Sequence, residues 1–167
     1  MSYLIETART GIRCLENQDL DNLMTIYANP HIMENSIYGV QSKEQVQALI
    51  MSQCQYYKQW NYSLWVVIDL ESQQLIGCAG LENKKVDGEV LVTIAYRFCE
   101  GIWGRGLATE VVEAILTYAH QVLKLPAIYA IIKPDNEPSK RVAEKAGFIY
   151  QYATQYLTHP VELYKWS

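Results

Sequence analysis

The stretch Gly101-Ile102-Trp103-Gly104-Arg105-Gly106-Leu107-Ala108-Thr109-Glu110 decides the fold of this chain. An apolar run, residues 90–98, precedes it, and an amphipathic run, residues 107–125, begins inside it. The expected order is strand, tight glycine turn and helix, which aims backbone N–H groups and the positive end of a helix at one point. Because such a point binds phosphate, the stretch predicts a site for a phosphate-bearing ligand.

Length and composition are those of one globular domain, which we place at residues 1–167. Half of the residues are hydrophobic and 19% are charged, which are ordinary proportions for a folded protein. The net charge is −4 and no basic tract occurs. These features argue against a nucleic-acid partner.

The four cysteines carry neither a metal-site pattern nor a disulfide pattern. Cys14, Cys54, Cys78 and Cys99 lie far apart and form no C-x-x-C pair. We therefore expect no metal site and no disulfide framework, as is usual in a reducing cytoplasm. Residues 1–6 lack the basic and apolar regions of a leader peptide, and no apolar run reaches the ~18 residues of a membrane span. The expectation is a cytoplasmic protein that does not insert into membranes.

The first half of the chain predicts two helices followed by an antiparallel meander. Residues 9–15 indicate a strand, and Asn17 is a candidate N-cap for a helix that Asn29-Pro30 ends. A loop through Gly39 leads to Ser42-Lys43-Glu44-Gln45, a capping box for the second helix. Strands are then expected at residues 62–69, 74–81 and 89–98, with short turns at 70–73 and 82–88.

The second half alternates helix and strand. An apolar stripe predicts a helix over residues 107–125, which Pro126 ends, and a strand follows at 127–132, parallel to 89–98. Pro134-Asp135-Asn136 begins a last helix, Gly147 takes its C′ position, and residues 148–153 and 161–166 close the chain as a hairpin. The whole predicts an α+β fold: a mixed, mostly antiparallel seven-stranded sheet flanked by about four helices.

Two common nucleotide motifs do not fit the glycine stretch. A Walker A loop requires Gly-Lys followed by Ser or Thr, and the chain contains no such sequence. A dinucleotide-binding fingerprint requires G-x-G-x-x-G early in a βαβ unit. Here Gly101, Gly104 and Gly106 give G-x-x-G-x-G, and they follow an antiparallel meander. Both readings fail on spacing and context.

A second motif lies 30 residues beyond Gly106, where Asn136-Glu137-Pro138-Ser139 precedes Gly147-Phe148. Together with Trp103-Gly104-Arg105-Gly106, and over residues 10–164, this pattern resembles the GNAT acetyltransferase superfamily. It resembles most the branch that acetylates N-terminal alanines of ribosomal proteins, and this implies an acyl-CoA N-acyltransferase-like fold. In that family the loop cradles the pyrophosphate of acetyl-coenzyme A. The family's usual Gln or Arg at the first loop position is Gly101 here.

The resemblance implies a set of coenzyme A contacts. The N–H groups of residues 104–108 would face the diphosphate at the helix N-terminus, and the side chains of Arg105 and Thr109 would assist. Arg105 is equally well read as a solvated charge. The pantetheine arm would lie along the strand at residues 96–98, where a backbone N–H would stabilise the oxyanion. The expected cofactor-binding residues are Tyr96, Arg97, Phe98, Gly101, Gly104, Arg105, Gly106, Leu107, Ala108, Thr109, Asn136 and Ser139. The alternative for the glycines is that they end a strand and pack closely on a helix.

The catalytic groups are less well marked. Thr93 stands where the resembled branch often has a glutamate, three residues before the strand tyrosine, so Glu89 is proposed as the base and Glu82 is a second candidate. Either carboxylate can also be a solvated surface group. Ala143 stands where many relatives have a tyrosine that protonates the leaving thiolate, and Ser139 is the candidate donor to the coenzyme A sulfur. Asn136 would bond the pantetheine amide, while helix capping is the alternative for both residues.

The resemblance implies an acetyl-CoA-dependent N-acetyltransferase, in which a primary amine attacks the thioester directly. A non-catalytic acyl-CoA-binding sensor on the same fold is the alternative, and a nucleotide-binding domain is the third reading. The acceptor amine belongs to a protein N-terminus, an amino acid, an antibiotic or a polyamine, and the sequence does not choose among them. A monomer and a homodimer both remain open.

Overall fold

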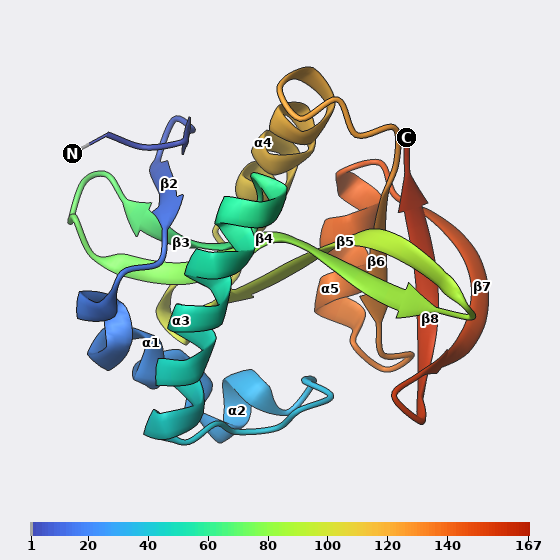
Figure 1. Ribbon diagram of the computed structural model, residues 1–167, viewed down its shortest axis with the longest axis horizontal. Coiled ribbons are helices and arrows are strands. Elements are labelled where there is room, and N and C mark those ends of the chain that lie inside the picture. The colour runs from blue at the N-terminus through green and yellow to red at the C-terminus, as the bar shows by residue number, and fades with distance from the viewer. Residues whose placement is uncertain (1) are drawn as a thin grey trace.

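The computed structural model describes residues 2–167 and, over that range, contains one eight-stranded sheet with five α-helices (Figure 1). The strand order is β1-β2-β3-β4-β5-β6-β8-β7, and every neighbouring pair is antiparallel except β5 and β6. The α+β fold class is confirmed. The additional strand is β1 (Ile5–Glu6), which sequence analysis missed because two residues are too few to show a period.

The first helices begin differently from the expectation. Asn17 is not an N-cap: it opens a 3-10 turn (Asn17–Asp19) that is capped by Glu16, and α1 (Leu20–Tyr27) follows. The physical reason lies in Asp19, whose carboxylate accepts from the Glu16 N–H and from the Arg13 guanidinium, at 2.8 and 2.9 Å. This fixes the turn one residue earlier than the sequence suggested.

Asn29-Pro30 ends α1 and also begins a short helix that was expected to be loop. The Asn29 side chain accepts from the N–H groups of His31 and Ile32, and this caps α2 (Pro30–Met33). The capping box at Ser42 is confirmed, because Ser42 and Gln45 exchange side-chain and backbone hydrogen bonds at the start of α3 (Lys43–Trp60).

The meander is formed by β2 (Thr10–Cys14), β3 (Leu64–Asp69), β4 (Leu75–Val86) and β5 (Glu89–Phe98). Strand β4 runs five residues past its expected end, and the turn before β5 shrinks to Asp87-Gly88. Both turn residues have positive φ, 50° and 85°, as tight hairpin turns require. This register pairs Val86 with Glu89 and Glu82 with Thr93.

The second half contains α4 (Leu107–Gln121), β6 (Ile128–Ile132), α5 (Glu137–Lys145), β7 (Ile149–Tyr156) and β8 (His159–Trp166). Helix α4 ends four residues before its expected end at residue 125. In the turn that follows it, Lys124 adopts a left-handed backbone conformation at φ 58°. Strand β6 is parallel to β5, as predicted. Strand β8 lies between β6 and β7, so the closing hairpin folds back into the sheet.

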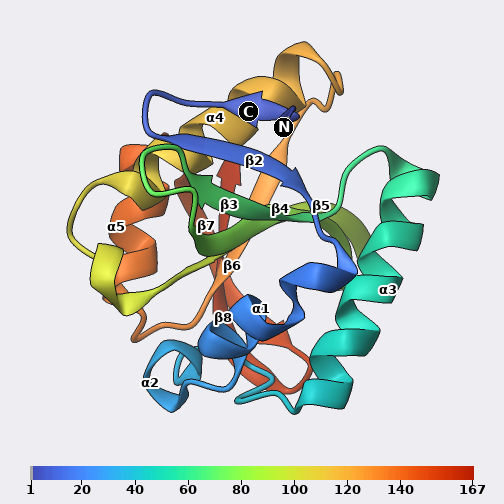
Figure 2. The same cartoon turned by 90° about the vertical axis from the view of Figure 1, so that its left-hand side faces the viewer.

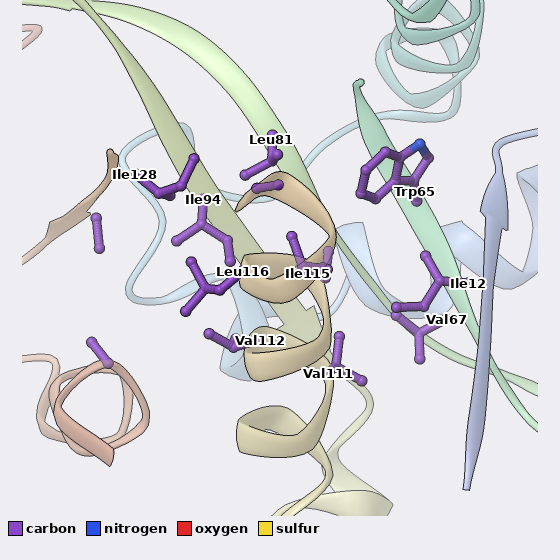
Figure 3. Close-up of a cluster of buried hydrophobic side chains, with 14 of the residues drawn as sticks. Ile12, Trp65, Val67, Leu81, Ile94, Val111, Val112, Ile115, Leu116 and Ile128 are labelled. Atoms are coloured by element: carbon purple, nitrogen blue, oxygen red, sulfur yellow. The ribbon is translucent and has the colours of Figure 1, made fainter. Parts of the chain in front are cut away.

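Helices cover both faces of the sheet, with α1 and α3 on one side and α4 and α5 on the other (Figure 2). Side chains of α4 pack on Leu81, Ile94 and Trp65 (Figure 3). Leu23 and Ile26 of α1 and Ile50 of α3 cover the opposite face. Side chains that alternate along β4 and β5 therefore point into two different layers. Within residues 2–167, no helix combines the length and apolarity that crossing a membrane requires.

Candidate functional site

One cavity of about 1190 Å³ runs across the molecule, and residues from both layers line it. One half lies among the turn before α4, the start of α4, β6 and α5. The other half lies among α2, the loop after it, α3 and the face of β4. Strand β5 contributes to both halves. The cavity therefore connects the predicted coenzyme A site, which we call the donor half, to the acceptor half on the opposite face of the sheet.

Strands β5 and β6 separate at the centre of this cavity. The two parallel strands share one register pair, Thr93 with Tyr129, and residues 94–98 of β5 have no partner on that side. Residues 94–98 and 130–133 line the opening. The N–H and C=O groups on this side of β5 are therefore available to an extended ligand, as at any strand edge, except the Phe98 carbonyl, which accepts from the Trp103 indole N–H.

The glycine turn opens into the same cavity. Gly104 and Gly106 have φ values of 80° and 75°, a backbone region that side chains rarely adopt. An added Cβ at Gly104 would meet nothing within 4 Å, and one at Gly106 would meet only Arg9 Nη2, at 3.7 Å. Close packing on a helix therefore does not explain these glycines. They shape the backbone and leave room above it.

The first turn of α4 faces this room. Gly106 is the N-cap residue, no side chain of residues 2–167 caps the helix, and the helical ladder begins with the Glu110 N–H donating to the Gly106 carbonyl. The N–H groups before Glu110 are left for another partner. Leu107, Ala108 and Thr109 line the cavity together with Gly104 and Gly106, whereas Gly101 and Arg105 are exposed beside it.

Glu100 and Trp103, which precede the glycine turn, hold it against α2. The Trp103 indole N–H donates to the Phe98 carbonyl at 3.0 Å, and its ring meets that of His31 edge-on at 5.3 Å. The Glu100 carboxylate accepts from Asn29 Nδ2 at 2.9 Å and lies 3.3 Å from His31 Nδ1. The segment that shapes the glycine turn is thus held against the opposite half of the cavity.

A second link, which sequence analysis missed, ties the N-terminal strands to α4. Arg9 Nε donates to the Glu110 carboxylate at 2.8 Å, and Arg9 Nη1 donates to the Arg105 carbonyl at 3.0 Å. Thr7 Oγ1 also donates to Glu110. The partners are about a hundred residues apart, so no local pattern connects them.

Tyr96 and Arg97 point to opposite sides of β5. The Tyr96 hydroxyl donates to the Ser139 carbonyl at 3.0 Å, and burial raises the pKa of this phenol far above its ordinary value. Arg97 donates to Ser36 Oγ at 3.1 Å and lies over the Tyr27 ring, 5.8 Å from its centroid. Their side chains are thus engaged elsewhere, and the backbone between them borders the opening.

Asn136 caps α5, because its side chain accepts from the Ser139 N–H at 3.3 Å. Both residues line the cavity, and no residue in the range 2–167 hydrogen-bonds to the Ser139 hydroxyl. Ala143 is fully buried one turn further along. The hydroxyl of Ser139 is therefore a protic group that the first turn of α5 presents to the cavity with no partner among residues 2–167.

The two carboxylates considered as bases lie in different places. Glu89 is exposed at the start of β5, beside the hairpin turn, and does not line the cavity. Glu82 lines the cavity, and Gln53 Nε2 lies 3.4 Å from its carboxylate. The Thr93 hydroxyl, opposite Glu82 in the sheet, donates to the Glu82 carbonyl at 3.0 Å. Position 93 holds threonine instead of the glutamate that the resemblance predicts, and a glutamate, Glu82, lies opposite it on the neighbouring strand β4.

Among residues 2–167, no group of three or more His, Cys, Asp or Glu side chains is arranged to hold a metal ion. Cys14, Cys54, Cys78 and Cys99 are free thiols.

Known proteins match this chain over nearly its whole length. A family model described as an acetyltransferase (GNAT) domain matches residues 9–149. The YkkB protein of Bacillus subtilis (strain 168) is 27% identical over 159 residues, which cover 95% of this chain and 92% of that protein.

Solved structures show the same fold. A GNAT-family acetyltransferase from Bacillus anthracis has a TM-score of 0.81 at 24% identity, covering 96% of this chain and 95% of that one. RimL, a ribosomal L7/L12 α-N-protein acetyltransferase solved with coenzyme A, has a TM-score of 0.79 at 15% identity, covering 95% and 94%.

Proposed function

The chain belongs to the GNAT acetyltransferase family, and from that premise we propose that it transfers an acetyl group from acetyl-CoA to a primary amine by direct attack. One observation carries the proposal. The unpaired edge of β5 and the open glycine turn before α4 border a single cavity that also contains a carboxylate, Glu82. The cavity thus joins a phosphate site, a strand edge and a proton acceptor.

The donor half fits coenzyme A in its backbone chemistry. Gly104 and Gly106 leave open space over the turn, and the N–H groups of the first turn of α4 point their positive ends toward it. We assign the diphosphate to the N–H groups of residues 104–108. Gly101 and Arg105 shape the turn from outside, and Thr109 supplies a hydroxyl at its rim.

The opening between β5 and β6 fits the pantetheine arm. Backbone groups of Tyr96 and the Phe98 N–H pair with it as a neighbouring strand would, whereas Arg97 lies between them in register with Cys78 of β4. One of these N–H groups faces the carbonyl oxygen on which negative charge develops. Asn136 bonds the amide of the arm in addition to capping α5. When bound, acetyl-CoA supplies the activated thioester.

Glu82 is proposed as the proton acceptor. An amine is mostly protonated at neutral pH and must lose a proton to become a nucleophile. Glu82 takes that proton, the amine nitrogen forms the new bond to the acetyl carbon, and the bond from carbon to sulfur breaks. The Ser139 hydroxyl donates a hydrogen bond to the sulfur that leaves. The nitrogen loses its second proton as the tetrahedral intermediate collapses, and this proton converts the departing thiolate into the free thiol.

A non-catalytic acyl-CoA sensor is kept as the second candidate on one specific observation. The two positions that often hold acid and base groups in the family are here Ala143, which is fully buried, and Thr93, whose hydroxyl is bonded to the Glu82 carbonyl. Such a sensor would bind acetyl-CoA without turning it over.

Calorimetric titration and a thiol-release assay test the proposal together. We expect acetyl-CoA to bind the purified chain, and we expect free thiol to appear when an amine panel of amino acids, peptides, aminoglycosides and polyamines is added. Binding without thiol release from any amine would favour the sensor. Stabilisation by ATP or NAD without any by coenzyme A would overturn the family-based assignment of the cavity.

A further inference from the structure

We propose that the acceptor amine also carries a carboxylate, and that Lys84 binds this carboxylate while Glu82 receives the proton of the amine. The inference rests on the proposed function and names its substrate class. It starts from the charged side chains that line the acceptor half of the cavity, on the α3 side of the sheet.

Lys84 is a positioned cation, and within the described part of the chain it has no anionic partner. Its ammonium lies 5.7 Å from the centroid of the Tyr38 ring and 5.4 Å from that of Tyr156, so two aromatic faces hold it from different elements. It lines the cavity and is half-buried. No carboxylate of residues 2–167 lies within salt-bridge distance of it.

Glu82 and Lys84 are two residues apart on β4, so their side chains project from the same face, about 7 Å apart at the strand. Both side chains are flexible enough to converge on one small molecule. A ligand with an amine at one end and a carboxylate a few bonds away matches this pair in charge and in order. Free amino acids have this chemistry, and so does a peptide N-terminus followed by an acidic residue.

The charges around this pair disfavour an acceptor with several amines. Arg97 also lines this half of the cavity, and within residues 2–167 no carboxylate lies within salt-bridge distance of it. A polyamine or aminoglycoside would bring its additional ammonium groups close to Lys84 and Arg97, which is electrostatically unfavourable.

Lys84 is a better carboxylate ligand than Arg97 for an amine at Glu82. Arg97 is bonded to Ser36 and lies over Tyr27. Thr93 is the partner of Glu82 on β5, and Arg97 is four residues further along that strand. Arg97 is therefore ~13 Å from the position opposite Glu82.

The test compares matched acceptors in the thiol-release assay. One arm uses free amino acids and their carboxamides, and the other uses tripeptide amides that differ only in aspartate or asparagine at the second position. We expect the carboxylate form to be preferred by about tenfold or more in kcat/KM in at least one arm. A carboxylate raises the pKa of a nearby amine, so amine basicity alone would favour the carboxamide.

Variants of Lys84 separate its charge from its packing. Lys84→Gln and Lys84→Met should abolish the preference, and Lys84→Glu should reverse it. Lys85→Gln, at the exposed neighbour outside the cavity, should preserve it. Thermal melts establish that each variant is folded, and Lys84→Met retains an apolar stem against the two tyrosines.

Each result has one reading. Equal turnover of carboxylates, carboxamides and polyamines, or a preference that survives in both Lys84→Gln and Lys84→Met, would overturn the inference and leave the acetyltransferase proposal standing. Absence of thiol release from every amine would overturn that proposal and the inference with it.

Discussion

The Tyr96 hydroxyl donates a hydrogen bond of 3.0 Å to the backbone carbonyl of Ser139, and so joins β5 to the first turn of α5 across the opening between β5 and β6. Both residues line the cavity. Because the sheet does not pair in this region, this bond sets the distance between the strand edge and the helix on the other side of the opening. The Ser139 hydroxyl is positioned by the same turn.

Replacing Tyr96 with Phe should therefore impair coenzyme A binding more than stability. A typical net hydrogen bond contributes about 1 kcal/mol, so we expect affinity for acetyl-CoA to fall by up to about tenfold, measured by calorimetry. Tyr62→Phe is the matched control, since it removes a tyrosine bond to Asn83 outside the cavity. Equal effects of the two variants on acetyl-CoA affinity would argue against a positioning role for Tyr96.

Burial of Tyr27 and Tyr96 should make the fold sensitive to alkaline pH. Burial raises the pKa of both phenols, so both stay protonated in the folded state when the unfolded chain has begun to ionise near pH ~10. Their contribution to stability is complete below that pH and falls as pH rises, by at most about 1.4 kcal/mol per pH unit for each group. Urea unfolding between pH 8 and pH 11 should show this decline, and Tyr96→Phe should make it shallower.

The glycine turn offers a test of the phosphate site. Gly106→Val places a side chain in the space over the turn and strains the backbone, which has φ 75° here. Gly106→Asn fills the same space with a side chain whose residue type tolerates this φ. We expect both to weaken acetyl-CoA binding by roughly 10- to 100-fold, the worth of one or more bonds to a charged group. Gly101→Ala is the control, because its φ is not positive and it lies outside the cavity. Tight binding by a folded Gly106→Asn variant would contradict the assignment.

The link between the N-terminal strands and α4 should be worth measurable stability. Desolvation raises the pKa of Glu110, but the hydrogen bonds from Thr7 and Arg9 outweigh it and leave that pKa below its ordinary value. The carboxylate therefore stabilises the fold above its unfolded-state pKa, and this contribution is lost as pH falls through the folded-state pKa. Glu110→Gln should cost about 1 kcal/mol in urea unfolding at pH 7, whereas Glu113→Gln, exposed and without an ion pair, should cost almost nothing.

Short-range signals in the sequence were sufficient for the elements that surround the donor site. The positive φ values at Gly104 and Gly106 and the cap at Asn136 depend on residues within a few positions, so local chemistry specifies them. The Arg9–Glu110 pair joins residues that are about a hundred positions apart in the sequence, so it has no local signature.

The choice between Glu82 and Glu89 depended on register. A loop over residues 82–88 would have left Glu82 in a turn, but β4 continues to Val86 and pairs it with Glu89. One tight turn therefore brings Glu82 opposite Thr93 and leaves Glu89 at the hairpin tip. Turn length is decided by cross-strand packing as well as by the turn residues, and a single sequence does not reveal it.

Glu82 and Glu89 can be separated by the same conservative change. Glu82→Gln removes the carboxylate that lines the cavity and keeps the side-chain shape, so we expect kcat to fall by roughly 10²- to 10⁴-fold, while acetyl-CoA affinity remains close to that of the unmodified protein. The loss should shrink as the assay pH rises, since a larger fraction of the amine is then already deprotonated without help from the protein. Glu89→Gln should leave the rate unchanged at every pH, because this residue is exposed at the start of β5. A large rate loss in Glu89→Gln with normal turnover in Glu82→Gln would return the role of base to the residue that sequence analysis first selected.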